Sequence, residues 1–306
     1  MLYKADVARG SAWARYFSEN APDLDFHVWP DCGALEQVEY LIAWAPGREL
    51  LAQMPRLRVI FSTGAGVDQI DFSAVPAAVP IVRMVEPGII NGMVEYVTWA
   101  VLSIHRRIRA YADLQAQQRW QELAGPTADK VCVGVMGLGS LGSAVLNRLA
   151  TFGYQLAGWS RSRKSIAGVR CFAGKDELPG FLARCHVLVC LLPLTGETLG
   201  ILNARLFAAL PQGAALVNVG RGAQLEEQAL LTALGSGQLS EAILDVASPE
   251  PLPAGHPFWR HPQITVTPHI SSITQPLTAA AVVLENLRRH QRGEPLRDVV
   301  DRERGY

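Results

Sequence analysis

The sequence has no surplus of charge of either sign. Its 306 residues include 28 lysines and arginines and 28 aspartates and glutamates, so the formal net charge at neutral pH is zero. A nucleic-acid-binding domain usually carries a basic surplus, and a solvating tail carries an acidic one. The charge balance therefore argues against nucleic acid as a partner and against an extended acidic segment.

Cysteine is scarce, and its spacing shows no pairs. The sequence contains five cysteines and no CxxC motif. Such a set fits neither a disulfide framework nor a zinc site, and no other spacing of His, Cys, Asp or Glu suggests a metal. We expect free thiols, no bound metal and a cytoplasmic protein. The cysteines are Cys32, Cys132, Cys171, Cys185 and Cys190.

Long hydrophobic runs are also missing. The densest apolar run, Val187–Leu192, ends at Pro193, whereas about 18 apolar residues are needed to cross a bilayer. The first ten residues include three charged ones and lack the apolar stretch of a signal peptide. We therefore expect a soluble protein with no membrane partner. At roughly 150 residues per domain, the length suggests two domains.

Short apolar runs alternate with helical patterns along most of the chain. Several runs are continuously apolar, which is typical of strands buried on both faces of a parallel sheet. The alternation predicts an α/β protein with parallel sheets. The expected strands are Asp25–Trp29, Tyr40–Trp44, Val59–Ser62, Val131–Met136, Gln155–Trp159, Val187–Leu192, Ala215–Val219, Ala242–Asp245 and Ile264–Thr267.

Two long helices are predicted, Asn91–Gln118 and Gln275–Arg292, each with an apolar stripe at spacings of three and four. No Gly/Ser linker separates domains, so a boundary must fall at the end of an element. We place the crossings within the first helix and just after His269. The expected domains are residues 1–98 with 270–306, and residues 99–269.

The most specific local motif is VCVGVMGLGSLG, in which Gly137, Gly139 and Gly142 form G-x-G-x-x-G between a strand and a helix. The glycines permit a tight turn, close approach of a pyrophosphate, and close helix–strand packing, respectively. The helix start at Ser140 and Leu141 then offers free N–H groups to the phosphates. The alternative is a glycine-rich turn without a ligand.

The end of the next strand indicates which dinucleotide binds. An NAD site usually places Asp or Glu there to bind the ribose hydroxyls. Here the strand continues into Ser160, Arg161, Ser162 and Arg163, with Lys164 after them and no carboxylate. Arginine can bind a 2′-phosphate through two hydrogen bonds. This favours NADP over NAD; the alternative is a solvated basic loop.

Three polar residues follow predicted strands in the second half of the chain: Arg221, Glu250 and His269. Ligands of open α/β sheets bind beyond the carboxyl ends of the strands. Arginine can bind a carboxylate, histidine can supply a proton near neutral pH, and a carboxylate can orient the imidazole. Taken singly, each residue could instead be a surface ion pair, a solvated side chain or part of a turn.

Five motifs in this order, GLGSLG, CLLPLT, NVGRG, DVASPEPL and TPHIS, resemble the D-isomer-specific 2-hydroxyacid dehydrogenase family. The resemblance covers nearly the whole chain. It implies a Rossmann dinucleotide-binding domain, a discontinuous flavodoxin-like substrate domain, and Arg221, Glu250 and His269 as the catalytic set. The WSRSRK stretch and the region around Trp44 most resemble the branch of glyoxylate/hydroxypyruvate reductases.

The resemblance also assigns weaker candidates. Backbone amides at Gly64, Ala65 and Gly66 would hold the substrate carboxylate, and Asp245 would hold the nicotinamide amide. Trp44 would form a wall of the substrate pocket, although core packing explains it about as well. The remaining cofactor-binding candidates are Leu192, Pro193, Val219 and Gly220.

The implied activity is NADPH-dependent reduction of small 2-keto acids, such as glyoxylate and hydroxypyruvate, to D-2-hydroxy acids. Closure of the domains at the two crossings would exclude water. The resemblance also implies a homodimer, in which the segment around Trp120 would contact the neighbouring subunit. Two alternatives stay open: a nucleotide-sensing, corepressor-like protein on the same fold, and a dehydrogenase for another D-2-hydroxy acid.

Overall fold

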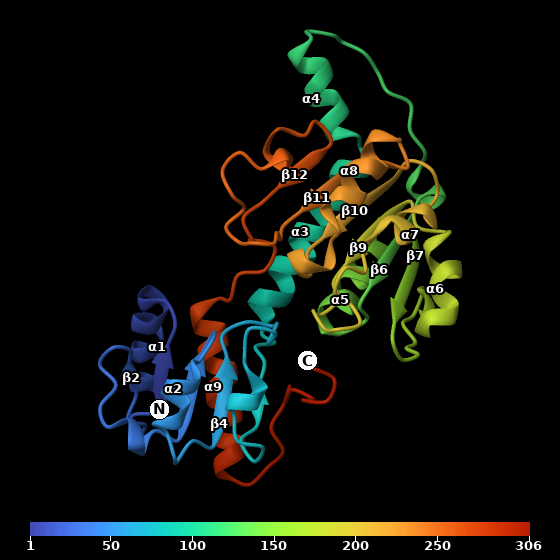
Figure 1. Cartoon of the computed structure of the whole chain (residues 1–306). Helices are drawn as coiled ribbons and strands as arrows, with labels where there is room; N and C mark the ends of the chain where they lie inside the picture. The colour runs from blue at the N-terminus through green and yellow to red at the C-terminus, as the bar shows by residue number, and fades with distance from the viewer. The chain divides into compact units, whose positions relative to one another are not determined.

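The computed structural model describes residues 1–306, which form two compact units. The terminal unit comprises Met1–Ile89 and Ile273–Tyr306, and the central unit comprises Ile90–Ser272. The chain therefore crosses between the units twice, after Ile89 and after Ser272. Each unit has its own parallel sheet with helices packed on it (Figure 1).

The terminal unit is built on a five-stranded parallel sheet with the order β2-β1-β3-β4-β5. This is the flavodoxin-like order 2-1-3-4-5. Its strands are β1 (Leu2–Lys4), β2 (His27–Val28), β3 (Tyr40–Ala43), β4 (Val59–Ser62) and β5 (Ile81–Val82). Its helices are α1 (Val7–Asn20), α2 (Arg48–Ala52) and α9 (Pro276–Gln291), and α1 packs beside α9.

The central unit is built on a seven-stranded parallel sheet with the order β12-β11-β10-β9-β6-β7-β8. Counted along the chain, its first six strands follow the Rossmann order 3-2-1-4-5-6, which reverses between β6 and β9. The strands are β6 (Cys132–Met136), β7 (Gln155–Ser160), β8 (Arg170–Ala173), β9 (Val187–Cys190), β10 (Ala214–Asn218), β11 (Leu239–Leu244) and β12 (Ile264–Val266). The two parallel sheets confirm the predicted fold class.

Helices cover both faces of the central sheet. Along β6, Val133 and Val135 face a core that includes residues of α3 and α5, whereas Cys132 and Met136 face a core formed with α6, α7 and α8. This alternation explains why the central strands read as continuous apolar runs. The helices are α3 (Pro87–His105), α4 (Ile108–Ala116), α5 (Ser140–Ala150), α6 (Gly174–Leu182), α7 (Ala204–Ala208) and α8 (Glu227–Gly235).

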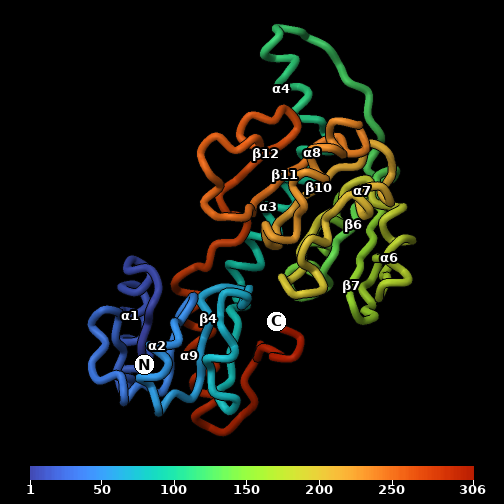
Figure 2. The backbone as a smooth tube through the Cα atoms, viewed as in Figure 1, coloured from blue at the N-terminus to red at the C-terminus, as the bar shows by residue number.

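The helix predicted over Asn91–Gln118 is not continuous. It is divided into α3 and α4, because Arg107 adopts a left-handed conformation with φ of +55°. The Arg107 guanidinium donates to the carbonyl oxygen of Ala124 at 2.7 Å and so holds the segment that returns from α4 to β6 (Figure 2). An apolar stripe at helical spacing does not reveal such a break, since both helices continue the same pattern.

Two short strands, β1 and β8, were not predicted from the sequence. The predicted strand Asp25–Trp29 is reduced to β2. Single turns of 3₁₀ helix occupy Leu35–Gln37, Phe72–Ala74, Ala128–Lys130, Gly222–Gln224 and Pro257–Arg260. None of the helices combines the length and the apolar character needed to cross a membrane.

Candidate active site

A tight glycine turn joins β6 to α5. Gly137 has a φ of +105°, and a Cβ at this position would lie 2.6 Å from the carbonyl oxygen of Leu191. A Cβ on Gly142 would lie 1.9 Å from the carbonyl oxygen of Gly137, so glycine is required for the helix to start this close to the strand. A Cβ on Gly139 would meet no atom within 4 Å, so the space beside this residue is open.

The first turn of α5 has the properties of a phosphate site. Gly139 is the N-cap residue and supplies no side-chain cap, so the N–H groups of Ser140, Leu141 and Gly142 have no acceptor within the helix. These groups and the helix dipole favour an anion at this end. Together with the open space beside Gly139, the turn fits the pyrophosphate of a dinucleotide.

The loop after β7 is basic and exposed. Ser160 donates from Oγ to the carbonyl oxygen of Ser162 at 2.7 Å, which folds the loop back on itself. Arg163 forms an ion pair with Glu177 of α6. A hydrogen bond from the backbone N–H of Ala173, together with Arg163, holds the pKa of the Glu177 carboxyl below its usual value. The acidic group nearest this loop is therefore already bound to protein.

The residues Arg221, Glu250 and His269 follow three neighbouring strands, β10, β11 and β12. Because the strands are parallel, their carboxyl ends lie at one edge of the sheet. The turn after β10 packs tightly on the turn after β11, since a Cβ on Gly222 would lie 2.0 Å from the carbonyl carbon of Ala247. Topology and packing thus bring the three predicted residues to the same edge of the central unit.

A hydrogen bond joins two of these residues directly. The His269 Nδ1 lies 2.8 Å from Glu250 Oε2, and the other carboxyl oxygen of Glu250 accepts the backbone N–H of Ala247 at 3.1 Å. A carboxylate only accepts hydrogen bonds, so Nδ1 of His269 carries the proton in this pair. The ring is thereby oriented by Nδ1, and Nε2 is the nitrogen available to a substrate.

The turn that bears His269 is attached to a buried carboxylate. Asp245 is almost fully buried and accepts from Thr267 Oγ1 at 2.6 Å and from the backbone N–H groups of Ile270 and Ser271 at 2.8 Å. The His269 N–H donates to the carbonyl oxygen of Asp245 at 2.8 Å, and His269 itself has a φ of +55°. Both carboxyl oxygens of Asp245 thus bind this turn. That Asp245 also holds the nicotinamide amide, as the resemblance implied, stays a prediction.

Helix α3 supports the same turn. The Tyr96 hydroxyl lies 2.5 Å from Thr267 Oγ1, which in turn donates to Asp245. Burial raises the pKa of Tyr96 to about 12, so the phenol keeps its proton at physiological pH. Tyr96 donates this proton to Thr267, which completes a chain of hydrogen bonds from α3 to Asp245.

Arg221 lies in the turn between β10 and the 3₁₀ turn Gly222–Gln224. Its N–H donates to Gln224 Oε1 at 2.9 Å, and its carbonyl oxygen accepts from Asn218 Nδ2 at 3.2 Å. One guanidinium nitrogen donates to the carbonyl oxygen of Gly220 at 2.9 Å. The side chain thus has a hydrogen bond to its own turn, which ties the guanidinium to the turn.

The remaining cofactor candidates contribute backbone. The side chains of Leu192 and Val219 are buried in the two cores of the central sheet, and Gly220 is buried as well. The carbonyl oxygens of Leu192 and Pro193 both accept from Gln224 Nε2 at 3.0 Å. Of these four residues only Pro193 is partly exposed, so it is the one whose side chain could contact an adenosine.

The glycine loop of the terminal unit follows β4. The N–H of Gly64 donates to Ser62 Oγ at 3.3 Å, and its carbonyl oxygen accepts the N–H of Met84 at 3.0 Å. The Trp44 indole packs against this loop, because a Cβ on Gly64 would lie 2.5 Å from Trp44 Cζ3. Ala65 and the following glycine are partly exposed. The structure thus brings together Trp44 and the loop Gly64–Gly66.

Sequence reasoning missed several residues that shape the site. Asn218 and Gln224 hold the Arg221 turn, and Tyr96 and Thr267 hold the His269 turn. Asn218 and the TPHIS threonine belong to motifs that were noticed, but no spacing rule predicts which backbone atoms they bind. Nothing in the sequence marks Gln224, and only the structure shows that this polar residue is buried in the turn after β10.

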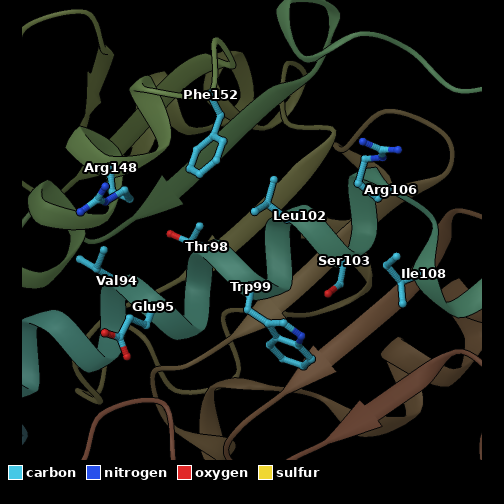
Figure 3. Close-up of a pocket in the computed structure, with 10 residues that line it drawn as sticks. All are labelled: Val94, Glu95, Thr98, Trp99, Leu102, Ser103, Arg106, Ile108, Arg148 and Phe152. Carbon is cyan, nitrogen blue, oxygen red and sulfur yellow. The ribbon is translucent and has the colours of Figure 1, made fainter.

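A groove on the outer face of α3 is separate from these residues. Its cavity of about 580 Å³ lies between α3 and the end of α5, where Phe152 and Arg148 face the helix (Figure 3). Its lining is apolar and aromatic with both signs of charge at its margins. The lining residues are Val94, Glu95, Thr98, Trp99, Leu102, Ser103, Arg106, Ile108, Arg148 and Phe152.

Comparison with known proteins assigns the family. Residues 98–271 match the model of the D-isomer specific 2-hydroxyacid dehydrogenase, NAD binding domain. The chain belongs to this family. It is therefore an oxidoreductase of the type that the ordered motifs suggested. The family assignment agrees with the glycine turn and the three strand-end residues.

Relatives cover almost the whole chain. A glyoxylate/hydroxypyruvate reductase A from Serratia proteamaculans is 42% identical over 300 residues, which are 96% of each chain. A family dehydrogenase from Xanthobacter autotrophicus, solved with NADPH and MES, has a TM-score of 0.95 at 40% identity and covers 100% of this chain and 98% of its own. An NADPH-dependent glyoxylate/hydroxypyruvate reductase from Sinorhizobium meliloti, solved with NADP and sulfate, has a TM-score of 0.92 at 35% identity, covering 100% and 98%.

Proposed function

We propose that this dehydrogenase reduces small 2-keto acids, glyoxylate and hydroxypyruvate in particular, to D-2-hydroxy acids with NADPH. The observation that carries the proposal is the 2.8 Å hydrogen bond between His269 and Glu250, at the sheet edge that also bears Arg221. Reduction of a ketone needs a proton donor for the developing alkoxide and a cation for the carboxylate. The names of relatives supply the substrate class.

Each residue has a distinct role in this proposal. Arg221 binds the carboxylate of the keto acid and polarises its carbonyl group, and the backbone of the loop Gly64–Gly66 binds the same carboxylate. His269 donates a proton from Nε2 to the carbonyl oxygen, while Glu250 keeps the ring in the required orientation. Bound NADPH supplies the hydride. Trp44, which packs on the glycine loop, forms a wall of the substrate site.

The preference for NADP over NAD rests on the loop after β7. The strand ends without a free carboxylate, and Ser160, Arg161, Ser162 and Arg163 can bind a 2′-phosphate. Two solved relatives contain NADPH or NADP. The first turn of α5, at Gly139–Gly142, would hold the pyrophosphate, and the Leu192–Pro193 loop and the Val219–Gly220 turn would contribute to the rest of the dinucleotide site.

The proposal includes a division of labour between the units. The dinucleotide is assigned to the central unit, and the loop Gly64–Gly66 that binds the substrate carboxylate is assigned to the terminal unit. The functional boundaries expected at 98/99 and 269/270 stay a prediction. So do a cytoplasmic location, for which five free cysteines are the argument, and the absence of a nucleic-acid partner, for which the zero net charge is the argument.

We also propose a homodimer formed through the central unit. Trp120 is fully exposed on the segment that leaves α4, and Trp99 and Leu102 line the groove on α3. Exposed aromatic residues gathered on one unit are typical of a protein contact surface. Sedimentation equilibrium should give twice the 33.3 kDa chain mass. A mass of 33.3 kDa at all concentrations would contradict this part of the proposal.

Steady-state assays test the proposed activity. NADPH and NADH are each offered with glyoxylate, hydroxypyruvate and bulkier 2-keto acids, and the chirality of the glycerate product is determined. We expect oxidation of NADPH by the two small substrates, a lower kcat/KM with NADH, and D-glycerate. Binding of NADPH without oxidation by any keto acid would favour a nucleotide-sensing protein. Turnover of only a larger keto acid would favour another D-2-hydroxy acid dehydrogenase.

A further inference from the structure

A completely buried amide lies directly behind the Arg221 turn. Gln224 has no exposed surface, and the core residues around the end of β9 include Leu192 and Leu202. A buried polar group in such surroundings destabilises the fold unless its hydrogen bonds are made. The amide of Gln224 donates two hydrogen bonds and accepts two. An apolar side chain could fill the same space but could make none of these bonds.

The hydrogen bonds of Gln224 join two loops. Its Nε2 donates to the carbonyl oxygens of Leu192 and Pro193, both at 3.0 Å. Its Oε1 accepts the N–H of Arg221 at 2.9 Å and the thiol of Cys190 at 3.6 Å. One side chain thus connects the loop after β9 to the turn after β10, which carries the arginine.

The Arg221 backbone is held on both sides. Gln224 binds its N–H, and the equally buried Asn218 donates to its carbonyl oxygen at 3.2 Å. The side chain of Gln224 lies so close to Gly220 that a Cβ there would be 2.3 Å from Oε1. The guanidinium donates back to the Gly220 carbonyl oxygen, so a displacement of the turn also displaces this anchor of the side chain.

We propose that Gln224 is a positioning residue, which holds the Arg221 guanidinium at a fixed place relative to the Leu192–Pro193 loop. The inference rests on the proposed function, in which Arg221 binds the substrate carboxylate and this loop lies beside the dinucleotide. A guanidinium on a looser turn would bind the two oxygens of a planar carboxylate less well, because bidentate binding depends on geometry. Gln224 itself touches neither substrate nor cofactor in this account.

A binding measurement tests the proposal without turnover. Oxalate has the planar oxygen arrangement of a 2-keto acid and cannot be reduced, so its Kd for the protein–NADPH complex can be followed by nucleotide fluorescence. We compare the wild type, Gln224→Leu, Arg221→Ala and the double variant. Gln228→Leu is the control, because Gln228 is an exposed glutamine four residues further along, in α8.

We expect Gln224→Leu to raise the oxalate Kd by about tenfold, the size of coupling found between residues in contact. In the Arg221→Ala background the same substitution should change the Kd by less than about twofold, since a positioning residue acts only through the arginine. Gln228→Leu should bind oxalate like the wild type. A general structural defect would instead weaken binding equally in both backgrounds, and that result would overturn the proposal.

The other outcomes are also decisive. Wild-type oxalate binding by Gln224→Leu, together with loss of binding in Arg221→Ala, would overturn the role of Gln224 alone. Wild-type binding by Arg221→Ala would overturn the proposed role of the arginine. Gln224→Met, whose unbranched side chain fills the same space, replaces Gln224→Leu if the leucine variant is insoluble. Insolubility of both variants would show that Gln224 stabilises the fold rather than positioning Arg221.

Discussion

At the scale of single residues, the site depends on groups that hold a neighbour in place. His269 is oriented by Glu250 through Nδ1, and its turn is tied to the buried carboxylate of Asp245. Arg221 is held by two buried amides. In each case the residue proposed to contact the substrate is partly exposed, and hydrogen bonds from neighbouring protein groups hold it or its turn in place. Such pre-organisation lowers the cost of reaching the reactive geometry.

Glu250→Gln should separate orientation from binding. A glutamine can still accept a hydrogen bond from His269 Nδ1 but cannot balance the charge of a protonated ring. We expect kcat for glyoxylate to fall by about 10–100-fold, less than the 10²–10⁴-fold attributed to a complete acid–base group, because the proton donor His269 is still present. The Kd for NADPH should stay unchanged, and Glu197→Gln, an exposed carboxylate substitution in the same unit, should have no effect. An unaltered kcat in Glu250→Gln would contradict the role given to Glu250.

The cysteines give a pH-dependent prediction. Burial raises the pKa of Cys190 to about 12 and raises those of Cys132 and Cys185 as well. A raised pKa keeps a thiol protonated and therefore unreactive at about pH 8. An aromatic disulfide reagent should label only the partly exposed Cys32 and Cys171 in the folded protein, and all five cysteines after denaturation. Rapid labelling of Cys190 in the folded state, located by mass spectrometry, would contradict the buried environment.

Sequence reasoning reached the residues whose chemistry is visible in their type and place. Arg221, Glu250 and His269 follow strands, and parallel strands bring their ends to one edge. It could not determine that the Asp245 carboxylate binds the 267–271 turn, or that Gln224 joins two loops, because both depend on the path of loop backbone. A buried glutamine has no sequence signature separate from that of an exposed one.

At the scale of elements, two glycines of the β6–α5 turn should behave differently. A side chain at Gly142 meets the carbonyl oxygen of Gly137, whereas a side chain at Gly139 meets open space. Gly142→Ala should therefore destabilise the protein by about 3 kcal/mol through overpacking. Gly139→Val should fold normally but raise the Kd for NADPH about 30-fold or more, equivalent to about 2 kcal/mol.

Thermal unfolding and NADPH titration of the two variants check this pair. The two effects serve as mutual controls, since one variant changes stability and the other changes ligand affinity. Tight NADPH binding by Gly139→Val would show that the pyrophosphate lies elsewhere. Normal stability of Gly142→Ala would show that the turn can rearrange.

Two helices share one buried carboxylate at their starts. Glu86 has no exposed surface and accepts from the N–H groups of Gly88 and Ile89, which begin α3, and from the N–H of Gln275 and the hydroxyl of Thr278 near the start of α9. The charge also complements both helix dipoles. These bonds lie beside both points at which the chain leaves and re-enters the terminal unit.

Glu86→Ala should lower the free energy of unfolding by about 2–4 kcal/mol, because several buried donors lose their acceptor. Chemical denaturation measures the change, with Glu19→Gln on the exposed face of α1 as the control that leaves stability unaltered. Equal stability of Glu86→Ala and wild type would mean that water replaces the carboxylate without cost. The sequence does not reveal these bonds, because Glu86 and its partners near the start of α9 are almost 190 residues apart.

At the scale of the whole molecule, the sequence predicted the type of sheet but not the order of its strands. Continuous apolar runs predicted parallel sheets, and the two sheets confirm them. Strand β1 has only three residues at the start of the chain, and β8 is exposed or only partly buried along its length, so neither shows a buried apolar run. The break at Arg107 leaves the apolar stripe intact. A discontinuous terminal domain was expected from the two crossings placed in the first long helix and just after His269, and the family resemblance implied the same arrangement.

The central claim is that His269 supplies the proton for reduction of a 2-keto acid by NADPH. The most direct test is a single-turnover measurement of nicotinamide oxidation, in which NADPH-loaded wild type and His269→Ala are mixed with saturating glyoxylate. The account predicts a rate about 10²–10⁴-fold lower in the variant, with NADPH affinity preserved. Equal rates in the two proteins would contradict it.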